Sequence, residues 1–286
     1  MSVKLRKEIL VLVFFALVLF AAGYFLPTGF DWERQYSKGI FPGFWMPWTR
    51  PLVSLLNLPA VFAITILAIG VRAYRYRPSP MAILLALVSL PVLWVLHLGT
   101  LDGLSLLGML LLPWGAPLVL IKPQIASFAL LAGKRSLVVT VIWILISFAI
   151  WGFWPLGFRE IFAPDWRVEW QQDISLFPYG LVLAIPLLWF SRGDQDLLMA
   201  AGSLATPHLF PYHFIVLMPT LARMRWYWMI AVWLVTWAPI FMANWWGPLF
   251  WHSGNLASIV FWLGIYYGAA QPYPRPVGFR LFPEGV

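Results

Sequence analysis

The chain has 286 residues, of which 62% are hydrophobic and only 10% are charged. So few charged side chains cannot cover the surface of a soluble protein of this length, and the composition predicts an integral membrane protein. The formal net charge of +8 comes from basic residues scattered through short loops, which argues against binding to nucleic acid. The chain has no cysteine, which excludes disulfides, thiolate catalysis and sulfur ligands for a metal.

The first apolar run extends from about Ile9 to Leu26 and is long enough to cross a membrane, which takes roughly 20 residues. We interpret it as a retained helix, because its exit, AAGYFLPTGF, lacks a convincing signal-peptide cleavage site. Three basic residues precede the run, so the positive-inside rule predicts a cytoplasmic N-terminus. Asp31 is then expected on the outer face, at the end of the first span.

The next two runs, at about 52–71 and 81–97, are predicted to cross inward to RAYRYRP and back out to the loop GTLDG. Residues 103–133 are apolar but interrupted by three prolines and by Lys122. This stretch is too long for one straight helix and too short for three spans. Broken or re-entrant helices are therefore expected, which membranes tolerate only where they line protein or a water-filled cavity.

The second half continues the alternation, with predicted spans at about 136–155, 177–190, 226–246 and 256–270. The segment 197–222 has charged residues at both ends. It must therefore leave the inner side and return to it, with ATPHLFPYH at its outer turn.

Together these patterns predict an all-α polytopic transmembrane helical bundle of about ten crossing or half-crossing segments. It forms a single domain over 1–270, with outer loops at about 27–51 and 156–176, followed by a Pro-rich cytoplasmic tail at 271–286. Both termini are expected in the cytoplasm, and the membrane is expected to be a bacterial inner (plasma) membrane.

Most acidic residues fall on the predicted outer side. Acids contribute little to orientation during membrane insertion, so their clustering on one face indicates a functional site there. The outer acids are Asp31, Glu33, Asp102, Glu160, Asp165, Glu169 and Asp173.

Asp31 is the strongest candidate for chemistry, because it follows a helix end among aromatic and amide side chains that could shape a pocket. The alternative is a solvated interfacial acid. Asp102 and Lys122 flank broken apolar segments, where an ionisable group is expensive unless it is paired or functional, so they contact either a substrate or each other. His208 and His213 flank the outer turn, but their spacing matches no strong ligand motif. We expect no metal and no cofactor.

Three stretches carry a resemblance to a known family. They are FDWERQYSKGIFPGFWMPWTRPLVSLL after the first span, HLGTLDGLSLLG followed by LVLIKPQIA, and LATPHLFPYHFIVLMP. In this order, over about Leu26 to Pro219, the chain resembles the integral-membrane C-type glycosyltransferase superfamily. It is most similar to glycosyltransferase family 87, the polyprenol-phosphate-mannose-dependent mannosyltransferases. The chain is shorter than typical members, lacks a large outer domain, and has Thr206 where the late turn of the family has Ser.

The resemblance implies a lipid-linked sugar donor that enters from the bilayer, with Asp31 as the general base for an acceptor hydroxyl. Lys122, Gln124 and His208 would hold the donor phosphate or sugar. Further candidate substrate contacts are Glu33, Arg34, Asp102 and His213. Membrane lipids and other membrane proteins are the remaining expected partners.

Two other functions stay open at this point. A catalytically inactive subunit of a membrane assembly would leave the charged groups scattered or mutually neutralised and would bury an apolar, tryptophan-rich side face. A small transporter needs a path through both faces and usually has an internal repeat, and no convincing repeat relates the two halves of the chain.

Overall fold

The computed structural model describes residues 3–26, 29–41, 45–162 and 171–269, and every element in this part of the chain is helical. Three helices are long and apolar enough to cross a membrane: α3 (Leu58–Tyr76), α9 (Lys134–Trp151) and α13 (Trp226–Trp246). A bent pair of shorter helices adds a fourth candidate. The all-helical prediction is confirmed for the described residues, in which Leu10–Gly23, Pro123–Ala132 and Leu181–Phe190 are shorter apolar helical stretches.

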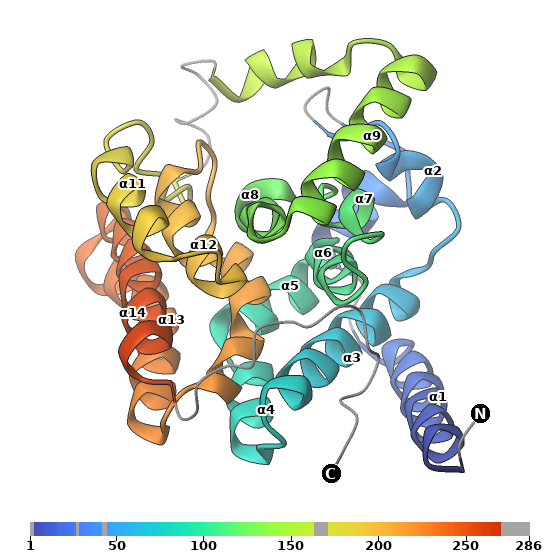
Figure 1. Ribbon diagram of the computed structural model, residues 1–286, viewed down its shortest axis with the longest axis horizontal. Helices are drawn as coiled ribbons and strands as arrows, with labels where there is room; N and C mark the ends of the chain where they lie inside the picture. The colour runs from blue at the N-terminus through green and yellow to red at the C-terminus, as the bar shows by residue number, and fades with distance from the viewer. Residues whose placement is uncertain (1–2, 27–28, 42–44, 163–170, 270–286) are drawn as a thin grey trace.

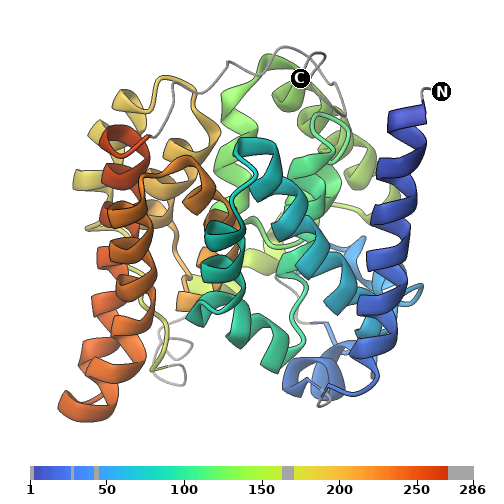
Figure 2. The same ribbon diagram turned by 90° about the horizontal axis from the view of Figure 1, so that it is seen from below.

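The first span corresponds to α1 (Val3–Gly23), which packs along α3 at one edge of the molecule (Figures 1 and 2). Its outward side chains, such as Leu10, Phe14 and Leu17, are more than half exposed. Exposed apolar side chains of this kind are expected on a helix that packs on the protein with one face and contacts lipid with the opposite face. A short helix, α2 (Thr49–Val53), leads into α3.

The third predicted span is not one straight helix. It consists of α4 (Pro80–Leu87) and α5 (Leu90–Leu98), which meet at an angle of 50°. Pro91 lies in the first turn of α5, where it supplies no backbone N–H to the preceding turn. A proline at such a position is an ordinary cause of a sharp bend.

The prediction of broken helices over 103–133 is confirmed. The stretch forms four short helices in succession, two of which begin with a proline in their first turn. Much of this region is buried inside the protein, as expected for broken helices in a membrane protein. The four helices are α6 (Asp102–Leu110), α7 (Ala116–Val119), α8 (Pro123–Ala126) and η2 (Ser127–Ala132).

The C-terminal part contains a helical hairpin. α13 is followed by η6 (Pro248–Gly254) and α14 (Asn255–Tyr267), and the backbone N–H of Arg225 donates to the Gly268 carbonyl at 2.8 Å. The start of α13 therefore lies beside the end of α14. Figures 1 and 2 show this pair on the side opposite α1.

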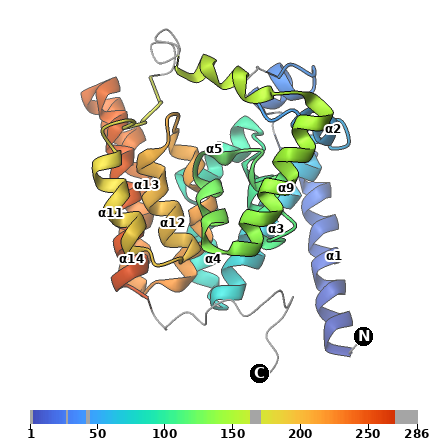
Figure 3. The ribbon, with the colours of Figure 1, turned by 45° about the horizontal axis from the view of Figure 1, so that its top comes forward.

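After α9, the helix η3 (Trp154–Phe162) extends across the end of the molecule that carries α2, opposite the start of α1 (Figure 3). The chain returns through α11 (Leu181–Phe190) and α12 (Gln195–Gly202). It then passes through η4 (Ser203–Ala205) to η5 (Pro211–Arg223).

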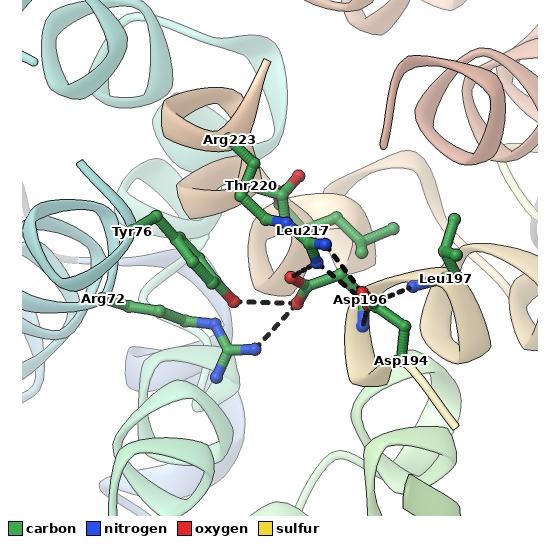
Figure 4. A network of polar contacts seen from close by, with 8 residues as sticks. All are labelled: Arg72, Tyr76, Asp194, Asp196, Leu197, Leu217, Thr220 and Arg223. Atoms are coloured by element: carbon green, nitrogen blue, oxygen red, sulfur yellow. Dashed lines mark hydrogen bonds and ion pairs between the residues drawn. The ribbon is translucent and has the colours of Figure 1, made fainter. Parts of the chain in front are cut away.

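A buried ion network joins both ends of the segment 195–223, from α12 to η5, to α3 (Figure 4). Asp196, which is 1% exposed, accepts hydrogen bonds from Arg72 at 2.8 Å and from the Tyr76 hydroxyl at 2.9 Å. Its other oxygen accepts from Arg223, which also pairs with Asp194 at 2.6 Å. Because Asp196 and Arg223 meet, the segment 195–223 leaves one end of the molecule and returns to it, as predicted.

Residues predicted to share the inner side lie together at this end. The Arg77 guanidinium donates to the Met224 carbonyl at 3.1 Å, next to the start of α13. The ends of α3, η5 and α14 therefore gather here with Arg72 and Arg223. The tail at 271–286 and the outer-loop residues 163–170 lie outside the described residues.

The network predicts a large effect of Asp196→Ala. The substitution leaves Arg72 and Arg223 close together without the carboxylate that separates them, and breaking a buried ion pair by removing one partner costs about 3–5 kcal/mol. We expect a clearly lower thermal midpoint for detergent-purified protein, measured by intrinsic tryptophan fluorescence. The exposed Arg225 offers a control, since Arg225→Ala should leave the midpoint nearly unchanged. Equal midpoints for Asp196→Ala and the wild type would show that the network contributes little.

Candidate functional site

A cavity of about 800 Å³ lies at the end of the molecule opposite the ion network. Its lining comes from both predicted outer loops, the end of α5, the start of α8 and the turn before η5. Its aromatic walls are Phe30, Trp45, Trp94, Phe128, Phe158, Phe210 and Tyr212. Its polar lining residues are Asp31, Gln35, His97, Lys122, Gln124, Ser127, Gln172, Thr206, His208 and His213. Five of the eight predicted site residues therefore share one cavity.

Two glycines place Asp31 at this cavity. Gly99 ends α5 with φ of +70°, a left-handed conformation that glycine adopts without a steric penalty. Gly29 packs directly on this turn, because a Cβ at Gly29 would lie 2.5 Å from the Leu98 carbonyl oxygen. A side chain at either position would push the two turns apart, so the close approach holds Asp31 beside the end of α5.

The environment of Asp31 favours its neutral form. Burial raises the pKa of the Asp31 carboxyl above its ordinary value, the charge of Lys122 lowers it by a smaller amount, and the charge of Asp102 raises it. A carboxylate with a raised pKa accepts a proton more readily than a solvated one. This property suits a general base.

Glu33 and Arg34 do not line the cavity, which corrects the expectation that they contact substrate. Both are exposed, and the Arg34 guanidinium lies 4.1 Å from the centroid of the Phe30 ring. The physical reason is the helical turn η1 (Trp32–Tyr36), a π-helix that begins directly after Asp31. One wide turn places Asp31 and Gln35 on the cavity side and the residues between them elsewhere.

Lys122 is buried within the protein. Its side chain is 8% exposed, its Nζ lies 4.4 Å from the centroid of the Trp45 ring, and its backbone N–H donates to the Ser105 hydroxyl of α6. Among the described residues, no carboxylate forms an ion pair with it. The ammonium therefore remains available to an anionic ligand in the cavity.

Asp102 is not part of the cavity lining. It is 2% exposed and accepts a hydrogen bond from the Thr100 hydroxyl at 2.6 Å. The structure thus supports neither of the two roles considered for it, because Asp102 neither pairs directly with Lys122 nor lines the cavity. Its position at the start of α6, which packs tightly on α3 through Gly103 and Thr65, explains this burial.

The turn before η5 is anchored on two sides. The Thr206 hydroxyl donates to the Gln124 carbonyl at 2.6 Å, and the Ile174 N–H donates to the Leu209 carbonyl at 2.7 Å. These contacts fix the turn against α8 and against the end of the second outer loop.

Asp173 is a residue of this site that the sequence did not single out. One of its oxygens lies 2.8 Å from His208 Nδ1, and the other accepts backbone N–H groups of Leu209 and Ser175. Burial opposes ionisation of Asp173, but these hydrogen bonds and the charge of His208 outweigh it and lower the pKa of the carboxyl. In the sequence, only the position of Asp173 among the predicted outer acids pointed to it. Its pairing with His208 joins two separate loops and cannot be seen in local sequence.

His213 is held differently from His208. It is 2% exposed, and its Nδ1 accepts the backbone N–H of Phe210 at 3.0 Å. The centroids of the two imidazole rings lie 6.4 Å apart. Within the described residues, no group of three or more potential metal ligands comes together.

The raised pKa of Asp31 predicts a stability effect with a definite sign. A carboxyl whose folded pKa is raised stabilises the fold below its unfolded pKa, and this contribution is lost as the pH rises through the folded pKa. Asp31→Asn mimics the neutral acid, so it should raise the thermal midpoint near pH 8 and have little effect near pH 4. The exposed Glu33 is the control, since Glu33→Gln should not produce this pH-dependent difference. A lower midpoint for Asp31→Asn at the higher pH would contradict the argument.

Comparisons of the chain with protein-family models, with curated proteins and with solved structures give no match.

Proposed function

We propose that the protein is a membrane glycosyltransferase that transfers a mannose-like sugar from a polyprenyl-phosphate donor to an acceptor on the extracytoplasmic face. The proposal includes a C-type glycosyltransferase-like bundle of about ten crossing or half-crossing segments. The observation that supports it best is the aromatic cavity that Asp31, with its raised pKa, shares with Lys122, which forms no ion pair among the described residues.

The proposed reaction is a displacement at the anomeric carbon. The acceptor hydroxyl attacks this carbon, its proton passes to the Asp31 carboxylate, and the bond between the sugar and the phosphate oxygen breaks. The polyprenyl phosphate leaves with the electron pair of that bond, and the sugar is transferred with inversion. Asp31 then returns its proton to water. Lys122 stabilises the charge that develops on the leaving phosphate.

The lining of the cavity suits such a donor. Seven aromatic side chains from several segments line the cavity, which gives contact surfaces for sugar rings and for a prenyl chain. The polar side chains of the lining include the basic Lys122 and the imidazoles of His208 and His213. This combination of aromatic and polar side chains is typical of sites for small amphipathic ligands.

The two alternative functions have less support. A transporter needs a path between both ends of the molecule, whereas the residues that line the cavity come from the end opposite the ion network. An inactive scaffold does not need the arrangement found in the cavity. There the Lys122 ammonium has no ion-pair partner among the described residues, and the half-buried Asp31 lines the same cavity. In contrast, the carboxylates at the other end are neutralised by arginines.

The orientation part of the proposal has a direct test, because the chain has no cysteine of its own. Lys38 and Tyr74 are both exposed and belong to opposite predicted sides. With both termini cytoplasmic, Lys38→Cys should react with a membrane-impermeant maleimide in intact cells. Tyr74→Cys should react only after the membrane is permeabilised. The reverse labelling pattern would place the cavity on the cytoplasmic side.

The catalytic role of Asp31 predicts a selective loss of turnover. Positioned base catalysis typically contributes about 100-fold to 10,000-fold, so Asp31→Asn should lower kcat by that factor while the donor still binds. The assay uses purified protein, a radiolabelled polyprenyl-phosphate sugar, and membrane lipid or glycan acceptors.

Glu33→Gln is the matched control, because Glu33 is exposed and lies outside the cavity lining. This variant should retain turnover. Full activity of Asp31→Asn would remove Asp31 from the mechanism. A wild-type protein that neither binds nor turns over the donor would favour the scaffold function.

A further inference from the structure

The hydrogen bond between His213 and Phe210 determines the protonation of His213. The backbone N–H of Phe210 donates to Nδ1, so this nitrogen carries no proton. A neutral imidazole with an unprotonated Nδ1 carries its proton on Nε2, whereas a charged imidazolium has no acceptor nitrogen. The side chain is therefore a neutral donor that offers one N–H.

This donor has no partner within the described part of the chain. His213 is 2% exposed, and its Nε2 is buried without a hydrogen bond. The ring is fixed by the rings of Tyr212 and Phe210, with centroids at 4.5 and 5.9 Å. Buried donors are almost always satisfied in native proteins, because an unmade hydrogen bond is costly.

Two other side chains of the cavity also have polar atoms that lack a full set of partners among the described residues. The Oε1 atom of Gln124 is also buried without a partner, and the Lys122 ammonium contacts the Trp45 ring rather than a carboxylate. All three side chains line the same cavity but come from two separate segments. A single ligand group with several oxygens could satisfy both donors at once.

We propose that His213 Nε2–H and Lys122 Nζ together bind the phosphate group of a lipid-linked ligand, and that Gln124 accepts a hydrogen bond from a neighbouring hydroxyl. A phosphate suits this pair because its oxygens point in different directions and can accept hydrogen bonds from both donors. Its negative charge would also provide the anionic partner that Lys122 does not have among the described residues. The choice of a lipid-linked phosphate rests on the proposed function. The requirement for an anionic oxygen rests on His213 and Lys122 themselves.

The test measures binding without turnover. The probe is farnesyl phosphate, compared with farnesol, which lacks the phosphate, and with inorganic phosphate, which lacks the lipid. Affinity is measured with detergent-purified protein by tryptophan fluorescence, since Trp45 and Trp94 line the cavity.

His213→Asn is the informative variant, because its Oδ1 can still accept the Phe210 N–H while the Nε2–H donor is lost. Loss of a hydrogen bond to a charged group should weaken binding of farnesyl phosphate by about tenfold or more and leave farnesol binding nearly unchanged. Lys122→Met should produce the same selective loss. His252→Asn is the control, since His252 is exposed and lies outside the cavity lining.

Parallel losses for farnesyl phosphate and farnesol, or no loss for either, would overturn the role of His213. The same holds if the wild-type protein does not bind farnesyl phosphate. Inorganic phosphate that binds as tightly as farnesyl phosphate would overturn the lipid source of the ligand. Thermal midpoints of the variants identify any that fail to fold, and Lys122→Met then decides the question independently.

The outcome separates this inference from the proposed function. Selective loss of farnesyl phosphate binding in a protein that transfers no sugar would support the phosphate site and contradict the glycosyltransferase. Sugar transfer by the wild type with unchanged binding in His213→Asn would do the opposite.

Discussion

The burial of Asp196 between Arg72 and Arg223 is the contact on which the arrangement of the helices depends. A carboxylate that is 1% exposed is tolerated only when its charge and its lone pairs are satisfied. Here two guanidinium groups and the Tyr76 hydroxyl satisfy it. The contact ties both ends of the segment 195–223 to α3, and the turn of this segment then reaches the cavity at the opposite end of the molecule.

The cavity end is assembled by a different kind of contact. Backbone groups and small side chains meet there: Gly29 packs on the turn at Gly99, the Thr206 hydroxyl donates to Gln124, and the Trp48 indole donates to the Pro117 carbonyl at 2.9 Å. These contacts use few charges, and neither Asp31 nor Lys122 forms an ion pair among the described residues. Arginines pair with the buried acids of the ion network, whereas Asp31 and Lys122 at the cavity have no ion-pair partner among the described residues, as expected of functional groups.

Several features follow from local sequence alone. Long apolar runs and basic loops predicted α1, α3, α9 and α13, and prolines predicted the interrupted helices over 103–133. The sequence predicted one functional site on the outer side, and five of the residues predicted for it line one cavity. The bend between α4 and α5 was missed, although Pro91 could have indicated it. The prediction that Glu33 and Arg34 contact substrate was wrong for a local reason as well. One π-helical turn determines which side chains of this segment face the cavity.

The sequence by itself determined that this chain is helical, apolar and interrupted between 103 and 133, because hydropathy and proline act over a few residues. Only the tertiary structure decided which charges meet. Arg72 and Asp196 are separated by 124 residues, and His208 reaches Asp173 across 35. Composition does not show which acid pairs with which base, because the Coulomb energy of a pair depends on the distance between the charges. Packing sets those distances. The same packing buried Asp102 and left Asp31 facing the cavity.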